Sequence, residues 1–248
     1  MDKKIHVTIW SEFTHEKTDP EAKAMYPDGL HRQIANYLGK TADFEVTTVA
    51  LDDPDQGLPE WLLNRTDVLV WWGHIRHGDV DDALVERIIQ RILRKGMGFI
   101  ALHSAHHSKI FKRIIGATGN LCWGKEQSEI VWNMAPSHPI AAGIPDHFVL
   151  KKEELYGEPF YIPQPNELVF GSWFEDGHIM RSGCCFLRGV GKIFYFQPGH
   201  ETCPSYYNEY VLRIIRNAVY WAKPNDFGFD TTTENGIEVL TPITDELK

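Results

Sequence analysis

Short apolar runs typical of strands alternate with amphipathic runs typical of helices through the first half of the chain. Runs that are apolar throughout, such as Asp67–Trp72 and Gly98–Leu102, suit strands buried on both faces, as in a parallel sheet. Two further strands are expected at Ile5–Trp10 and Phe44–Ala50. Because strands that alternate with helices form right-handed βαβ units, the pattern predicts an α/β fold with a doubly wound, mostly parallel sheet.

The expected helices are marked by the residues at their ends. Asp79 is a suitable N-cap and Gly96 a suitable C-cap for the strongest helical pattern, which has acidic residues in its first turn and basic residues in its last. An earlier helix is expected over Leu30–Leu38. A final helix is expected over roughly Tyr206–Trp221, where aromatic and aliphatic residues recur on one side.

Between Asn120 and Gly191 the pattern changes to short β runs separated by prolines and glycines. We interpret this region either as an insertion or as an antiparallel extension of the same sheet. Lys192–Gln197 then returns to a buried strand. Residues 1–223 are therefore expected to form a single domain, followed by an acidic tail over 224–248. We expect that tail to be flexible, to add an edge strand, or to contact a second subunit of a homo-oligomer.

The composition excludes several classes of protein. With 34 acidic and 25 basic side chains the formal charge is −9, which argues against nucleic acid or anionic lipid as the main partner. A hydrophobic content of 43 % excludes intrinsic disorder. No apolar run approaches the roughly 20 residues that span a bilayer, and the N-terminal run is too short for a signal peptide. We expect a cytoplasmic protein whose four cysteines are free thiols in small buried positions.

Histidine is unusually frequent, with 12 copies in the chain. Six copies follow predicted parallel strands, namely His74, His77, His103, His106, His107 and His200. In an open α/β sheet, ligands bind in the crevice beyond the carboxyl ends of the strands. We therefore expect His74, His103 and His200 to converge in one pocket, and His77 to be a solvated turn residue. The other six, including His15, share no location and are expected to be structural.

The segment ALHSAHHS has the pattern of a strand, a sharp turn and a helix. Ala101 and Ala105 flank His103 at positions −2 and +2, where a strained elbow requires small residues. Such an elbow exposes its central side chain at the top of the sheet. We favour His103 at this position, with a helix starting near His106. Two alternatives stay open: Ser104 as a serine nucleophile, or a capping serine beside a structural histidine.

Three neutral imidazoles around one cavity, those of His74, His103 and His200, suit two kinds of chemistry. They can ligate Zn²⁺ or a similar divalent ion and leave a coordination position open for catalysis. They can equally act as general acid and base, because histidine titrates near neutrality. The chain has no HExxH motif, the local signature of many zinc sites. It also has no GxGxxG loop, so no nicotinamide or flavin site is expected.

These segments resemble the ThuA (trehalose utilisation) family, whose fold is that of class I glutamine amidotransferases. The likeness covers roughly residues 4–223. Its most specific parts are GMGFIALHSA, then SHPIAAGIP followed by EELY (Glu153–Tyr156), and finally GKIFYFQPGH followed by a helix ending in YWAKP. The resemblance implies a flavodoxin-like, doubly wound sheet with an inserted antiparallel β region.

Class I amidotransferases carry a nucleophilic cysteine at the elbow, within Gly-x-Cys-x-Gly, and a His-x-Glu pair after a late strand. In this sequence the elbow residue is His103, and Glu201 is adjacent to His200 rather than two residues on. An imidazole cannot form the thioester that glutamine hydrolysis needs. We therefore expect glutamine amidotransferase activity to be absent, despite the shared fold.

The resemblance implies a role in the catabolism of trehalose, a related disaccharide or a 3-keto-sugar. Histidine, glutamate and aromatic side chains suit a polyhydroxylated ligand. Glu154, Tyr156, Ser104 and Glu201 are the candidate substrate-binding residues, and Glu201 has the alternative role of orienting a histidine. The aromatic residues available as ligand platforms, each of a type more often found in a core, are Trp71, Trp72, Trp123, Trp132, Tyr156 and Trp173.

Three functions stay open. The leading one is an enzyme in which His74, His103 and His200 act as acid/base groups or metal ligands in the isomerisation or hydrolysis of a carbohydrate. The second is a non-catalytic sugar-binding or regulatory protein, because the elbow nucleophile of the related enzymes is missing. The third is a subunit that assists a dehydrogenase partner, which would have to supply the redox cofactor.

Overall fold

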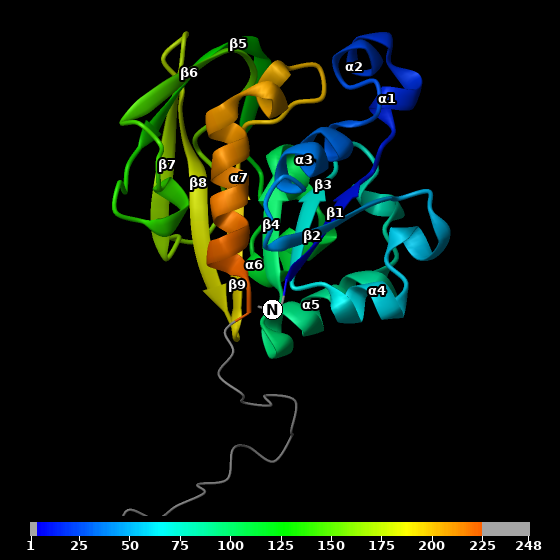
Figure 1. Ribbon diagram of the computed structural model, residues 1–248. Coiled ribbons are helices and arrows are strands. Elements are labelled where there is room, and N and C mark those ends of the chain that lie inside the picture. Colours follow the sequence, from blue (N-terminus) through cyan, green and yellow to red (C-terminus); the bar gives the residue numbers. More distant parts are fainter. Residues whose placement is uncertain (1–3, 225–248) are drawn as a thin grey trace, which may run out of the picture.

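A sheet of nine strands runs through residues 4–224, the part of the chain that the computed structural model describes (Figure 1). The strand order is β2-β1-β3-β4-β9-β8-β7-β5-β6. The strands are β1 (Ile5–Ser11), β2 (Phe44–Ala50), β3 (Val68–Trp72), β4 (Gly98–Leu102), β5 (Cys122–Asn133), β6 (His147–Gly157), β7 (Glu167–Phe174), β8 (Ile179–Arg188) and β9 (Gly191–Phe196). The predicted acidic tail lies outside the described residues, apart from Pro224.

Helices cover both faces of the parallel half of the sheet. The helices are α1 (His15–Thr18), α2 (Pro20–Met25), α3 (Leu30–Leu38), α4 (Glu60–Arg65), α5 (Asp82–Lys95), α6 (Lys109–Ile115) and α7 (Glu209–Ala222). Apolar residues of α3 and α7 form one core cluster with one sheet face, and those of α4, α5 and α6 form a second cluster with the other face (Figure 1). No helix within residues 4–224 is long and apolar enough to cross a membrane.

The sheet is mixed rather than mostly parallel, so this part of the predicted fold class is wrong. β2, β1, β3, β4 and β9 pair in parallel, whereas β9, β8, β7, β5 and β6 pair in antiparallel fashion. The middle region is therefore an antiparallel extension of the same sheet, one of the two predicted arrangements. Parallel neighbours need a long crossover, usually a helix, whereas the short turns that join β7 to β8 and β8 to β9 can connect only antiparallel ones.

Three predicted helix starts are displaced because short 3₁₀ turns precede the helices. Asp79 ends such a turn, and α5 begins at Asp82. The elbow continues as a 3₁₀ turn over His103–His107, so the next helix begins at Lys109 rather than near His106. The final helix starts at Glu209, where the side chain of the preceding Asn208 accepts hydrogen bonds from the first helical N–H groups.

The cysteines follow the predicted pattern with one exception. Cys184 and Cys185 belong to the two different core clusters, as expected for adjacent residues that point to opposite faces of a strand. Cys203 is also buried, but Cys122 is exposed, because β5 begins with its side chains in solvent. All four are free thiols.

Glu129 of β5 is a carboxylate in the interior of the antiparallel extension. Its side chain is 0 % exposed, and neither oxygen has a hydrogen-bond partner among the described residues. Burial, with a further contribution from the charge of Glu153, raises the pKa of Glu129 well above its ordinary value. An ionised carboxylate here would lack the partners that make a buried charge tolerable.

We expect Glu129→Gln to stabilise the protein at neutral pH. The unfolded chain ionises this group near its ordinary pKa, whereas the folded protein holds the proton to a higher pH. Each pH unit between the two pKa values therefore costs the folded state about 1.4 kcal/mol, which the amide does not lose. Urea unfolding at several pH values should show a gain for the variant that grows from about pH 5 upward.

The exposed Glu175→Gln is the matched control for this measurement, and its stability should follow the wild type at every pH. Equal stability of Glu129→Gln and the wild type at pH 8 would show that Glu129 ionises normally in the folded protein.

Candidate functional site

His103 lies at the sharp turn after β4 that the sequence predicts. Its φ is +51°, a strained value for a residue with a side chain, and Ala101 and Ala105 are fully buried on either side of it. The expectation that this elbow exposes its central side chain is wrong. Glu154 and Tyr156 of β6 contact the imidazole, Tyr156 by ring stacking at 4.7 Å, and the residue is 0 % exposed.

Both ring nitrogens of His103 face hydrogen-bond acceptors. Nδ1 lies 2.9 Å from the backbone carbonyl of Gln197, and Nε2 lies 3.0 Å from the carboxylate of Glu154. Because a carbonyl and an ionised carboxylate can only accept, both nitrogens carry protons. Burial works to lower the pKa of His103, but the hydrogen bond and charge of Glu154 outweigh it, with help from Glu153 and Glu201, and the pKa is raised.

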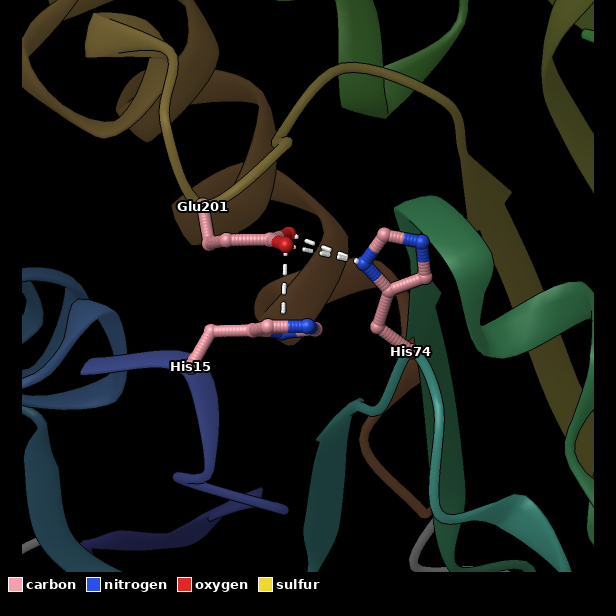
Figure 2. A group of neighbouring side chains, drawn as sticks. All are labelled: His15, His74 and Glu201. Carbon is pink, nitrogen blue, oxygen red and sulfur yellow. Dashed lines mark hydrogen bonds and ion pairs between the residues drawn. The ribbon is translucent and has the colours of Figure 1, made fainter. Parts of the chain in front are cut away.

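Glu201 lies between two imidazoles (Figure 2). Its oxygens are 3.0 and 3.1 Å from Nδ1 of His74 and 3.0 Å from Nδ1 of His15. Burial raises the pKa of Glu201, but the hydrogen bond and charge of His74 and the charges of His200 and His15 outweigh it and lower the pKa to about 2. His74 donates from Nδ1 to this carboxylate, and its other ring nitrogen points away from Glu201 (Figure 2).

His200 is held in a similar way at its Nδ1. That nitrogen lies 2.8 Å from the hydroxyl oxygen of Thr202, and this hydroxyl donates to Glu126. The backbone N–H of Thr202 also donates to Nδ1, at 3.3 Å, so Thr202 alone engages this nitrogen and Nε2 faces the neighbouring carboxylates. Nε2 is 3.8 Å from Glu154 and 3.7 Å from Glu201. Burial and the charge of His103 lower the pKa of His200 to about 4, so the ring is neutral at neutral pH.

The three histidines predicted to share a pocket lie together. The ring centroids of His74 and His103 are 5.8 Å apart, and each is 5.4 Å from the ring of His200. Among residues 4–224, three groups hold possible metal-ligand atoms within 4.8 Å of one another, namely His15–His74–Glu201, His74–Glu154–His200 and Glu126–His200–Cys203. The predicted triplet is not one of these groups, and both nitrogens of His103 are instead engaged by Gln197 and Glu154.

A cavity of about 260 Å³ opens beside these side chains. It is lined by His74, Ile75, Ser104, His106, His107, Leu121, Trp123, Glu154 and Tyr156. Three of the four predicted substrate-binding residues are therefore at the cavity, and the fourth, Glu201, instead orients His74. No lysine or arginine is among the lining residues.

The cavity wall also carries two hydroxyl groups and one exposed tryptophan ring. Ser104 and Tyr156 share a hydrogen bond of 2.6 Å at its wall. Trp123 is 75 % exposed at the cavity, which makes it the available aromatic platform. Trp71 and Trp72 are fully buried core residues. The other two tryptophans considered as platforms, Trp132 and Trp173, are not among the residues that line the cavity.

Two buried carboxylates hold the loops that carry His74 and His200. Glu12, 1 % exposed, accepts hydrogen bonds of 2.8–3.0 Å from the backbone N–H groups of His74, Ile75 and Arg76. Glu153, 0 % exposed, accepts from the N–H groups of Gly199 and His200 at 2.9 and 3.1 Å, and from the hydroxyl of Ser205.

Sequence reasoning missed Glu12 and misplaced His15 and His77. His15, expected to be structural, contacts Glu201, and Glu12 precedes it at the same strand end. His77 is not a solvated turn residue, because it is half-buried and burial lowers its pKa to about 3. Cys203 lies near His200, but burial raises the pKa of its thiol, so it is not a thiolate nucleophile at neutral pH.

Comparisons with known proteins identify the family of the chain and its fold. The ThuA (trehalose utilisation) family model matches residues 6–222. A structure described as a ThuA-like protein from Bacteroides uniformis is 16 % identical, with a TM-score of 0.62 over 93 % of this chain and 96 % of that one. A cytoplasmic protein from Salmonella typhimurium is 13 % identical, with a TM-score of 0.60 over 88 % and 99 % of the two chains.

A structure from Thermoplasma acidophilum described as a GMP synthase component is 12 % identical, with a TM-score of 0.50 over 89 % of this chain and 94 % of that one. No match is found among curated proteins. The fold is thus that of a glutamine amidotransferase-like α/β protein. The chain belongs to the ThuA family, and this membership indicates a role in carbohydrate utilisation.

We expect Glu12→Ala to lower the free energy of unfolding by about 2–4 kcal/mol, because three backbone N–H groups lose a charged acceptor. Glu12→Gln should lose less, since one side-chain oxygen still accepts. Urea unfolding measures both. The control is Glu21→Ala at an exposed position, which should change stability by less than about 0.5 kcal/mol. A loss no larger in Glu12→Ala than in this control would contradict the role given to Glu12.

Proposed function

We propose that this protein is a cytoplasmic enzyme of carbohydrate utilisation that isomerises or hydrolyses a neutral sugar, such as a trehalose derivative or a 3-keto-sugar, with the help of a bound divalent metal ion. The observation that carries the proposal is the convergence of possible ligand atoms from His74, His200 and Glu154, all within 4.8 Å of one another, where His74 and Glu154 line the cavity. Two histidines and one glutamate form the ligand set of several catalytic zinc sites.

The surroundings of these ligands support metal binding. Nε2 of His200 and the carboxylate of Glu154 are 3.8 Å apart, too far for a hydrogen bond but suitable for two ligands each about 2 Å from one ion. In each ring a partner engages Nδ1, Glu201 for His74 and Thr202 for His200, so that Nε2 is the nitrogen left for the metal. Partners of this kind fix the tautomer and the direction of a metal-ligating imidazole.

The proposal gives each side chain a distinct role. The ion, when bound, polarises a carbonyl oxygen or lowers the pKa of a water molecule. His103 is a positioning residue, because it is fully buried and holds the carboxylate of Glu154 toward the cavity. Ser104 and Tyr156 offer hydroxyl groups to the ligand from the cavity wall.

A neutral sugar is the substrate class that the cavity favours. Its volume of about 260 Å³ suits roughly one sugar unit, and its lining combines imidazoles, hydroxyl groups and a carboxylate with the exposed ring of Trp123. A sugar phosphate or a sugar acid would find no lysine or arginine in this lining, and the bound ion would be its one cationic partner there.

A second candidate is isomerisation without a metal. The ion pair between His103 and Glu154 favours it, because Glu154 could then act as the base that removes a proton next to a carbonyl, with the His103 imidazolium as its partner. Activity that survives complete removal of metal by a chelator would select this candidate over the first.

We expect chelator-stripped protein to bind one equivalent of Zn²⁺ in isothermal titration calorimetry. His74→Ala and His200→Ala should each abolish this binding, and Glu201→Gln should weaken it by about 10- to 100-fold through His74. His178→Ala, at an exposed histidine that neither lines the cavity nor belongs to a possible metal-ligand group within residues 4–224, is the control and should bind as the wild type does. Stoichiometric binding that His74→Ala leaves intact would refute this ligand set.

We expect turnover of a neutral disaccharide or keto-sugar to depend on the same residues. Trehalose and its 3-keto derivative are the first substrates to test, with product detection by mass spectrometry. His103→Ala should lower turnover by at least about 100-fold, because it releases Glu154 and leaves that carboxylate without its cation. Sugar binding without turnover, with or without Zn²⁺, would instead favour a sugar-binding or regulatory protein.

A further inference from the structure

The solvent-facing side of the antiparallel strands carries an apolar row that crosses four strands. Val149 of β6 lies opposite Ile130 of β5, and Ile130 lies opposite Trp173 of β7. Trp173 in turn lies opposite Ile179 of β8. Directly opposed residues of antiparallel strands share a face. The row therefore runs without interruption from β6 to β8, and Trp132 of β5 lies two residues from Ile130 on the same side.

We call Ile130, Trp132, Val149, Trp173 and Ile179 the outer apolar face. Four of them are exposed: Trp132 by 41 %, Val149 by 50 %, Trp173 by 49 % and Ile179 by 62 %. Together they expose on the order of 400 Å² of apolar surface, within the range of patches that mark interaction sites. An uncovered face of an antiparallel sheet is normally polar, so this composition calls for a covering partner.

Charge favours a second copy of this chain as that partner. The formal charge of −9 means that two copies repel each other wherever carboxylates meet. The five residues of the outer apolar face are uncharged, and the exposed charged residues two positions from Val149 and Trp173 are one cation and one anion, Lys151 and Glu175, so two copies can approach there without a net pairing of like charges. The interfaces of homodimers are also more apolar than those of transient complexes, and a two-fold axis matches one surface with itself.

The chemistry of the face fits protein better than sugar. Three of its five residues are aliphatic, and these offer none of the hydrogen-bonding groups that hold sugar hydroxyls. The exposed apolar area is about half of the roughly 800 Å² that each partner buries in a standard interface, so flanking residues need supply only the remainder. β6 adds an open sheet margin beside the face, since it has a partner strand on one side only within residues 4–224.

We propose that the outer apolar face is covered by a second copy of this chain in a two-fold symmetric dimer. No residue of the face lines the cavity, so the dimer leaves the functional site open. The inference does not depend on the proposed function.

The test is sedimentation equilibrium of the full chain at 1–50 µM, for which we expect a dimer. Trp173→Glu places two carboxylates at the centre of the symmetric contact and should shift the protein to a monomer, with a dimer dissociation constant at least 100-fold higher. Trp61→Glu is the matched control, because Trp61 is 66 % exposed on α4, and this variant should stay dimeric. Circular dichroism melting checks that both variants are folded.

Two results would overturn the proposal. One is a wild-type protein that is monomeric over the whole concentration range. The other is a dimer that persists unchanged in folded Trp173→Glu. If Trp173→Glu is misfolded, Trp173→Thr, which keeps a β-branched residue in the strand, replaces it under the same criteria. A monomeric wild type that binds insoluble polysaccharide through Trp173 would identify the face as a glycan platform and reject the dimer.

Discussion

The hydrogen-bonded ion pair between His103 and Glu154 is the contact on which the rest of the site depends. His103 follows β4 in the parallel half of the sheet, and Glu154 belongs to β6 at the far margin of the antiparallel half. Four strands separate β4 from β6, so the two residues meet only because the antiparallel strands curl back over the strand ends. A backbone hydrogen bond of 2.8 Å from Glu158 to Ile179 of β8 closes the same curve.

Carboxylates with different partners give this site its geometry. Glu12 and Glu153 accept backbone N–H groups and so fix two loops, whereas Glu201 accepts from His74, contacts His15 and so fixes ring orientation. Glu129 has no such partner and holds its proton instead. The same side chain therefore serves as a loop anchor, an orienting group or a neutral core residue, according to the donors that the fold brings to it.

The carboxyl-end rule for parallel strands located much of the site from the sequence. It indicated His74, His103 and His200, and the same rule applied to the end of β1 would also have pointed to Glu12 and His15. The rule could not indicate Glu153 or the contact of Glu154 with His103, because these depend on strands of an antiparallel region with no fixed order in the sequence. His77 was misplaced because its burial comes from packing against the turn that carries His107.

By itself, the sequence determined the parallel half of the fold, the elbow at His103 and the absence of a thiol there, because apolar runs and small flanking residues act locally. Only the tertiary structure decided which groups are charged, which nitrogens are free and which residues share the cavity. Those properties depend on desolvation and on donors that come from distant strands, such as Glu154 beside His103. A histidine that looked like the exposed centre of the site is therefore its buried support.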